Sequence, residues 1–139
     1  MKAIHGFDQR EMLIRFALTG SEGDVNLEKD DDTRLRGKWA STLWFLLKQG
    51  HIAKIEGLDE IDRDGRIVAN IQRLHAGDDV RPEWIGNEKQ VLTRLYIVCD
   101  SKEALADCLK EYQGKVKALD ENGNNLILKG FDVDKALEL

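Results

Sequence analysis

The sequence has few of the residues from which disulfide-bonded or metal-bound folds are built. It contains two cysteines, one proline and three histidines in 139 residues. Cys99 and Cys108 show no CxxC spacing, so we expect two reduced core thiols instead of a disulfide or a cysteine zinc site. The histidines form no HExxH pattern and lie far apart, at His5, His51 and His75.

Long apolar runs and clusters of positive charge are also absent. The longest purely apolar run is 43–47, far shorter than the ~20 residues of a membrane-spanning helix. No basic and apolar leader opens the chain. The net charge is -5, and lysine and arginine are scattered along the sequence, whereas nucleic-acid binding needs clustered cations. We therefore expect a cytoplasmic protein with neither a nucleic-acid nor a membrane partner.

The motifs that would make this chain a catalyst by itself are missing. Neither GxxxxGK[ST] nor GxGxxG occurs, and Gly20 and Gly23 follow a predicted helix where a phosphate loop would open one. There is no GxSxG elbow. Ser41 falls inside a predicted strand and Ser101 at a predicted helix start, so we expect structural roles for both. The sequence predicts no catalytic residue, no cofactor-binding residue and no self-sufficient active site.

An acid-rich segment follows the first predicted helix and superficially resembles a calcium loop. The oxygen-bearing side chains alternate as they do in an EF-hand, at Asp24, Asn26, Glu28 and Asp30. However, Lys29 stands where that loop needs glycine, and Leu35 stands where it needs a bidentate glutamate. The segment is therefore expected to be a solvated connection without a metal site.

Hydrophobic spacing predicts two main helices and several strands. Residues 8–20 and 100–114 have helical periodicity; the second begins with a capping box of Asp100 and Glu103 and is expected to end at Gly114. Segments of strand composition and their turn signals recur along the rest of the chain, at 38–49, 51–58, 66–74, 91–99, 116–119 and 125–131.

Composition and short connections indicate how these strands are covered and paired. Residues 38–49 are apolar on both faces, which favours a strand covered on both sides, and residues 51–58 are expected to pair with them as a hairpin. Residues 120–124 have the Asn and Gly of a tight hairpin connection. No βαβ rhythm occurs, so the sequence predicts an α+β fold, a mainly antiparallel sheet with two main helices packed on it.

Read in order, four segments resemble the C-terminal region of ATP-grasp carboxylate-amine ligases, the group that includes glycinamide ribonucleotide synthetase, biotin carboxylase and the L-amino acid ligases. HIAKIEGLDEI is similar to a strand of that region that ends in I-x-G-L-[DE]. RIVANIQRLHAGDDVRP is similar to the following strand and its Gly-containing turn. QVLTRLYIVCDSKEALADCLKEY is similar to a strand that leads into a helix, and GFDQREMLIRFALTG resembles the helix that closes the ATP-grasp fold.

The resemblance implies a domain organisation and a partner. Residues 1–20 would be the helix that closes an upstream ATP-grasp fold, 21–37 an acidic connection, and 38–139 a β-rich C-terminal domain like a barrel-sandwich half. ATP and Mg²⁺ are implied for the parent protein, because no position in this sequence matches the family's metal ligands or phosphate-binding lysines. The implied partner is the ATP-grasp core of the same protein, and the chain would be an inactive piece of that ligase.

Four loop positions are the candidate contacts to the substrate or to the ATP-grasp core, namely His75, Asp78, Asp79 and Arg81. They lie after a predicted strand, where functional groups are often mounted, although Gly77 and the aspartates also explain the segment as an ordinary turn. The alternative hypothesis is a free-standing protein-binding or dimerisation module that uses its three tryptophans, Trp39, Trp44 and Trp84, as an interface.

Overall fold

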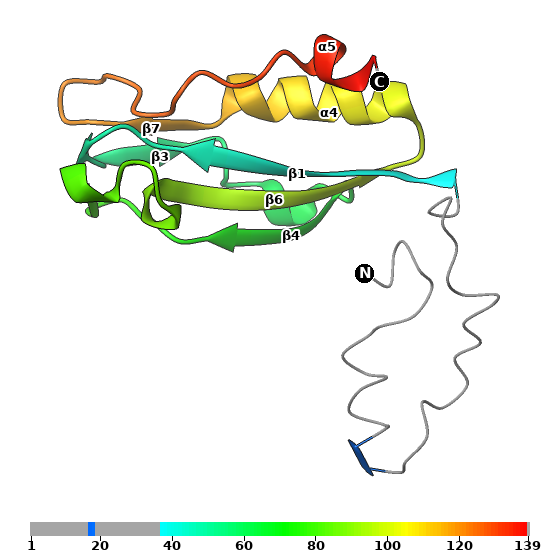
Figure 1. Ribbon diagram of the computed structural model, residues 1–139, viewed down its shortest axis with the longest axis horizontal. Helices are drawn as coiled ribbons and strands as arrows, with labels where there is room; N and C mark the ends of the chain where they lie inside the picture. The colour runs from blue at the N-terminus through cyan, green and yellow to red at the C-terminus, as the bar shows by residue number, and fades with distance from the viewer. Residues whose placement is uncertain (1–16, 19–36, 139) are drawn as a thin grey trace. The chain divides into compact units, whose positions relative to one another are not determined.

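The computed structural model describes residues 17, 18 and 37–138 of the chain (Figure 1). The chain separates into two units, Met1–Trp39 and Ala40–Leu139, and the fold below is that of the second unit. Ala17 and Leu18 are helical. Apart from these two residues, the predicted helix at 8–20 and the predicted acidic connection at 21–36 lie outside the described residues.

A three-stranded sheet forms one layer of the domain. Its strands are β1 (Trp39–Leu46), β4 (Ile67–Gln72) and β6 (Val91–Cys99), in the order β1-β6-β4. β4 and β6 are antiparallel, with Ile71 opposite Arg94, and β1 also runs against β6 (Figure 1). β6 is central, and most of its residues are buried.

Two small antiparallel pairs complete the strand content. β2 (Gly50–His51) pairs with β5 (Asp79–Val80), and β3 (Lys54–Glu56) pairs with β7 (Lys117–Leu119). Single turns of 3-10 helix lie in the connections, at Ile61–Arg63, Pro82–Trp84 and Glu88–Gln90. The predicted α+β fold with antiparallel strands and helices packed on them is confirmed, with the strands divided among three small sheets.

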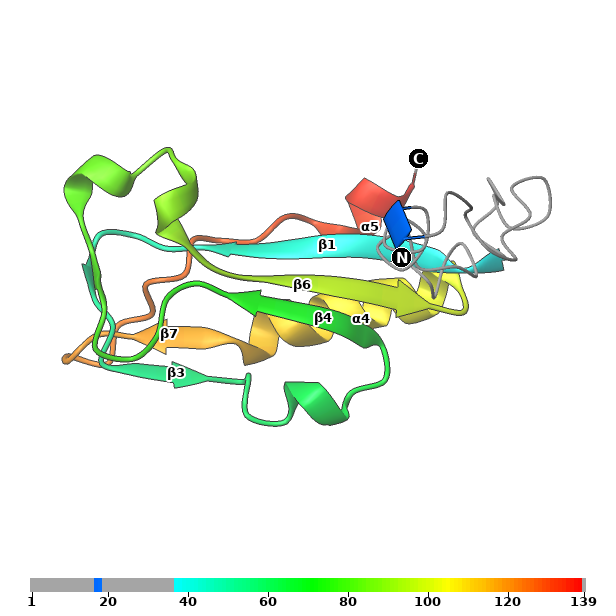
Figure 2. The ribbon, with the colours of Figure 1, turned by 90° about the horizontal axis from the view of Figure 1, so that it is seen from below.

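Helix α4 (Lys102–Lys115) covers one face of the three-stranded sheet (Figure 2). Its apolar stripe supplies four buried side chains to the core, Leu105, Cys108, Leu109 and Tyr112. The short helix α5 (Val133–Leu137) packs beside α4 and begins at Asp132, whose side chain accepts a hydrogen bond from the Lys135 amide at 3.1 Å. No helix among the described residues is long and apolar enough to cross a bilayer.

The prediction that residues 38–49 form a strand covered on both sides is wrong. In β1, Leu43 and Phe45 point into the core, whereas Trp44 is 49% exposed and Leu46 is 37% exposed. The physical reason is that α4 and the C-terminal segment lie on one face of the sheet, so the alternate face of β1 meets no layer of the described structure (Figure 2).

The predicted hairpin between residues 38–49 and 51–58 is also wrong. β1 pairs with β6, while the two short strands that follow it pair with β5 and β7. At its end, β1 instead meets the C-terminal segment, because the Leu128 amide donates to the Leu46 carbonyl at 2.8 Å and the Lys48 amide donates to the Leu126 carbonyl at 2.7 Å. Proximity in sequence predicted residues 51–58 as the partner of β1, whereas the actual partner is β6.

Other local predictions agree with the structure. β4 and β6 lie within the predicted strands. Residues 120–124 form the predicted tight connection, because Leu119 at the end of β7 makes an antiparallel bridge with Asn125. The helix ends differ in detail: Ser101, not Asp100, caps α4 by accepting from the Ala104 amide at 3.1 Å. Gly114 lies inside the last turn, and the helix continues to Lys115.

Gly57 fixes the approach of β3 to the end of α4, which gives a testable prediction. Its φ is 89°, and a Cβ there would lie 2.5 Å from the Lys115 carbonyl oxygen. Gly57→Ala should therefore lose more stability than Gly77→Ala, where φ is 97° but the space around the Cβ is open. Both variants carry about 1–2 kcal/mol of left-handed strain, and the clash should cost Gly57→Ala about 1–3 kcal/mol more.

Urea unfolding at neutral pH measures both variants against the parent chain. Equal losses in the free energy of unfolding would contradict this account of Gly57.

Candidate functional site

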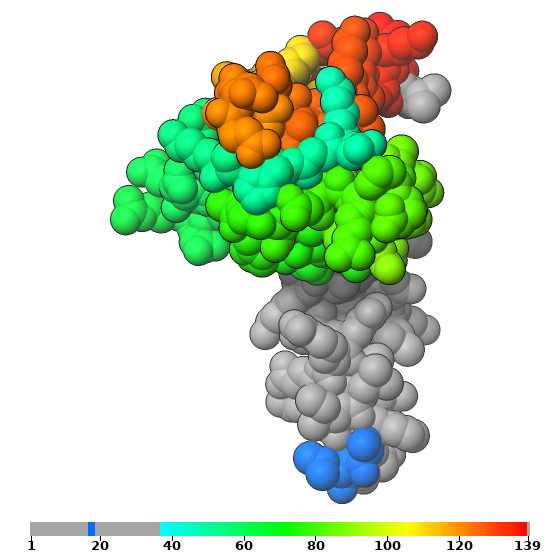
Figure 3. Space-filling model, turned by 90° about the vertical axis from the view of Figure 1, so that its left-hand side faces the viewer, coloured from blue at the N-terminus to red at the C-terminus, as the bar shows by residue number. Residues whose placement is uncertain are grey.

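The predicted contact residues lie at one end of the domain, in and beside the exposed loop after β4. Figure 3 looks at this end, where β2 (turquoise), the segment from about residue 75 (green) and the turn after β7 (orange) lie side by side. The Asp78 carboxylate accepts from the His75 amide at 2.8 Å, and the Asp78 amide donates to the His75 carbonyl at 3.1 Å. Together with the positive φ of Gly77, these bonds make a local turn.

Asp79 is paired with a residue from another element. Its Oδ1 lies 2.5 Å from Nδ1 of His51, across the β2–β5 pair. The hydrogen bond that the imidazole donates to Asp79 raises the pKa of His51 above its ordinary value, and the charge of Glu121 acts in the same direction. The arrangement holds an exposed imidazolium between carboxylates at neutral pH more readily than an isolated histidine would.

Arg81 makes a different contact. Its guanidinium carbon lies 5.6 Å from the centroid of the Trp84 ring, within range of a cation–π contact. The structure therefore brings Asp79 together with His51 and joins His75 to Asp78 in a turn. Arg81 stacks on Trp84 instead. Sequence reasoning considered His51 only as a lone histidine, because its partner is 28 residues away.

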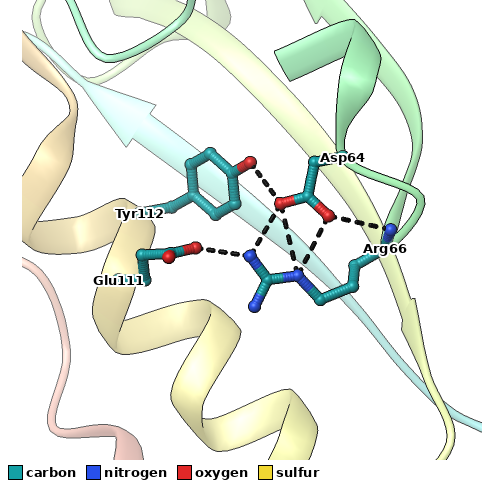
Figure 4. Close-up of polar contacts among 4 residues, drawn as sticks. All are labelled: Asp64, Arg66, Glu111 and Tyr112. Carbon is teal, nitrogen blue, oxygen red and sulfur yellow. Dashed lines mark hydrogen bonds and ion pairs between the residues drawn. The ribbon is translucent and has the colours of Figure 1, made fainter. Parts of the chain in front are cut away.

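A second polar cluster joins the connection before β4 to α4 (Figure 4). The carboxylate of Asp64 accepts from Arg66 at Nε (3.0 Å) and Nη2 (2.7 Å), and from the Tyr112 hydroxyl (2.6 Å). Arg66 Nη2 also donates to Glu111 at 2.5 Å. The sequence search found none of these four residues, because Asp64 and Tyr112 are 48 residues apart.

The charges of this cluster stabilise one another. The hydrogen bonds from Arg66, and then that from Tyr112, hold the pKa of Asp64 well below its usual range. Burial, reinforced by the neighbouring Asp64, raises the pKa of Tyr112. Each of the four side chains drawn in Figure 4 bonds to another of the four, so the cluster is best explained as a clamp between the loop and the helix.

Two buried thiols lie beside the clamp. Cys99 at the end of β6 and Cys108 on α4 are free cysteines, as predicted. Burial raises the pKa of Cys108 to about 12 and also raises that of Cys99, even though Arg66 acts in the opposite direction on both. Both thiols therefore stay protonated at neutral pH and are poor nucleophiles.

The remaining chemical candidates have structural roles in the described part of the chain. Ser41 lies within β1, and Ser101 caps α4. Among residues 17, 18 and 37–138, no group of three His, Cys, Asp or Glu side chains is placed to hold a metal ion. The acidic residues 24–30 that resemble a calcium loop lie outside the described residues.

Comparison with known proteins finds a likeness in fold. No protein-family model and no curated protein matches the sequence. Among solved structures, the chain is similar to the L-amino acid ligase from Bacillus licheniformis, with a TM-score of 0.64 and 15% sequence identity over 87% of this chain. The chain spans 28% of the length of that ligase. Its fold is thus shared with one part of an enzyme from the group that the sequence resembles.

The low pKa of Asp64 gives a prediction about stability and pH. Because its folded pKa is depressed, its contribution to stability is present above the unfolded pKa of about 3.9 and is lost as the pH falls toward the folded value. Asp64→Asn should lower the free energy of unfolding by about 2 kcal/mol at pH 7, and the difference from the parent should shrink below about pH 4.

Urea unfolding of the parent and Asp64→Asn at pH 7, 5 and 3 measures this convergence. Asp59→Asn, which changes an exposed carboxylate on the same connection, is the matched control and should unfold like the parent at each pH. A loss at Asp64→Asn that stayed constant across this range would rule out a charge-based clamp.

The His51–Asp79 pair makes a second prediction. Asp79→Asn removes the carboxylate that raises the pKa of His51, so the titration midpoint of this imidazole should fall toward about 6.5. The measurement is an NMR pH titration of the His51 ring. Asp78→Asn, next to it in the same loop, should leave the His51 midpoint unchanged, and an equal shift in both variants would contradict the specific pair.

Proposed function

We propose that this chain is the C-terminal, substrate-side domain of a cytoplasmic ATP-dependent ligase that joins a carboxylate to an amine. The observation that supports this most is the shared fold with part of an L-amino acid ligase over 87% of the chain. The short sequence phrases that resemble ATP-grasp ligases, including HIAKIEGLDEI, point to the same group independently of the fold. The matched share of the ligase, 28% of its length, fits a role as one domain of a larger enzyme.

In the proposed reaction, ATP phosphorylates a carboxylate and releases ADP, which leaves an acyl phosphate. The nitrogen of the amine then attacks the acyl carbon, the bond to phosphate breaks, and the nitrogen loses a proton as the amide forms. ATP and Mg²⁺ are proposed to bind the ATP-grasp core of the parent protein, which is the partner of this domain. This chain alone would then be inactive.

The role of this domain would be to shape the substrate end of the cleft. The loop that carries His75, Asp78, Asp79 and Arg81 is the proposed contact surface toward the substrate or the core. Two features support it: the loop is largely exposed, and the His51–Asp79 pair provides a protonatable group beside it. A carboxylate substrate would be attracted to Arg81, because the charge of protonated His51 is offset by Asp79.

A second function is favoured by one specific observation. Trp39 is 43% exposed and Trp44 is 49% exposed on β1, and exposed tryptophans are enriched at protein interfaces. A free-standing binding or homodimerisation module would use the face of β1 that carries Trp44 without any catalysis. In that case the likeness to a ligase would reflect a shared fold with a different task.

The two functions are distinguished by the protein encoded in the complete native reading frame. The ligase proposal expects an ATP-grasp core in frame upstream of Met1, and release of ADP and phosphate that depends on both a carboxylate and an amine. The same protein without residues 38–139 should lose the amine-dependent turnover. A native stop codon directly before Met1, or turnover that is unaffected by the deletion, would contradict the proposal.

The matched control uses the chain by itself. Addition of ATP with Mg²⁺ should leave its melting temperature unchanged, because a ligand that binds the native state raises the midpoint. A clear rise would place a nucleotide site inside these 139 residues and would contradict the assignment of ATP to another domain.

A further inference from the structure

β1 is a terminal strand whose outer edge is only partly covered. In the order β1-β6-β4, β1 pairs with β6 on one side. On the other side, the segment 126–128 bonds to Leu46 and Lys48. Since alternate residues of a strand direct their backbone groups to the same side, the N–H and C=O of Thr42 and Trp44 face outward too. Among the described residues, no backbone bond from outside the sheet reaches either of them.

A pocket of about 200 Å³ opens along this bare stretch of edge. It lies between β1 and the C-terminal segment, which run side by side (Figures 1 and 2). The last backbone bond from the C-terminal segment to β1 is that of Leu128. Beyond it the segment and the strand separate, and the pocket lies between them. Its lining is mostly apolar and consists of residues 43–46 and 127–131 together with Gln113 of α4. At its mouth, Leu128 and Phe131 are partly exposed.

Polar groups without partners lie on both sides of this edge. In the pocket lining, the amide nitrogen Nε2 of Gln113 is buried and has no hydrogen-bond partner among the described residues. On the open face of the sheet, Arg94 stacks on Trp44 with 5.1 Å to the ring centroid, and its Nε is likewise buried and unpaired. Lys129, at the pocket, forms no ion pair with any described residue.

We propose that the edge of β1 binds an extended peptide segment in which apolar residues alternate with carboxylates. The peptide adds as a strand beside Thr42 and Trp44, so their outward backbone groups gain partners. This binding site goes beyond the proposed ligase function and does not depend on it.

Strand addition places successive side chains on opposite faces. The apolar ones enter the pocket beside Phe131, where a backbone carbonyl of the peptide can accept from Gln113 Nε2. The others fall on the open face, next to Trp44 and Arg94. A carboxylate there pairs with the unpartnered guanidinium, a charge-assisted bond that is stronger than a neutral one.

Charge decides between this occupant and a second copy of the chain. Arg94, on β6 beside Trp44, and Lys129, at the pocket, have no carboxylate partner among residues 37–138. An isologous pair of β1 edges would present the same lining to itself, and residues 43–46, 127–131 and Gln113 include no carboxylate. An acidic segment of another protein supplies the missing charge.

The test titrates the full chain with a short synthetic peptide in which glutamate and leucine alternate, followed by amide-resolved NMR. We expect saturable binding with a Kd below about 1 mM, and shifts concentrated at 42–46 and 127–131. Absence of binding at about 1 mM peptide, or shifts concentrated elsewhere, would overturn the proposal.

Two modified peptides test the strand geometry itself. One carries N-methyl groups on every leucine amide and the other on every glutamate amide. In an added strand only one of these sets faces β1, so one peptide should lose binding by at least about tenfold while the other keeps it. Equal binding, or equal loss, by the two peptides would exclude strand addition.

Variants of the chain provide an independent readout. Thr42→Pro removes one outward N–H while leaving the β6 side of the strand intact, a position at which edge strands tolerate proline, and Arg94→Gln removes the charge. Each should weaken binding of the glutamate–leucine peptide about tenfold, whereas Val68→Ser, on the opposite edge strand, should not. If Thr42→Pro fails to fold, the contrast between Arg94→Gln and Val68→Ser decides, and equal affinities there would overturn the acidic preference.

Discussion

The packing of α4 against one face of β6 is the contact on which the rest of this domain depends. The helix contributes Leu105, Leu109 and Tyr112, and the strand contributes Leu95 and Ile97, all nearly inaccessible to solvent. Burial of each such side chain is worth about 1.5–3 kcal/mol, so this layer outweighs any single polar contact. The clamp of Asp64, Arg66, Glu111 and Tyr112 then orients the helix, because its bonds join α4 to the loop that leads into β4.

The same packing leaves the domain open on its other side. One helix layer satisfies one face of a twisted sheet, and in β1 the alternate side chains, including Trp44, remain at the surface. The bare edge of β1 has a different cause, because the C-terminal segment bonds only to Leu46 and Lys48. The open face and the bare edge are also the features through which a domain of this fold could meet the rest of a larger enzyme or a separate partner.

The sequence predicted the elements whose signals are local. The alternation and β-branching of residues 91–99 and the periodicity of α4 each lie within one segment, so these elements were found with small errors at the caps. The strand partners were not predictable in this way, since β1 pairs with β6 across an intervening stretch that contains four other strands. The coverage of β1 was also misjudged, because an apolar composition does not say whether a second layer exists.

The same contrast between local signals and long-range contacts holds for the candidate sites. His75, Asp78, Asp79 and Arg81 were selected from a local loop pattern; His75 and Asp78 bond to each other within that pattern, whereas Asp79 has a partner outside it. His51 and Asp79 are 28 residues apart, and the clamp joins residues separated by up to 48 positions. Such contacts depend on the folded path of the chain. Only the absence of a phosphate loop or a nucleophile elbow could be predicted directly from the order of residues.

Amide hydrogen exchange along β1 tests most directly whether this strand is hydrogen-bonded on its β6 side and open at its outer edge. The account predicts that Leu43 and Phe45, whose N–H groups face β6, exchange slowly, whereas Thr42 and Trp44, whose N–H groups face outward, exchange much faster in the free chain. Uniformly slow exchange at all four amides would show that the edge is already covered and would contradict the account.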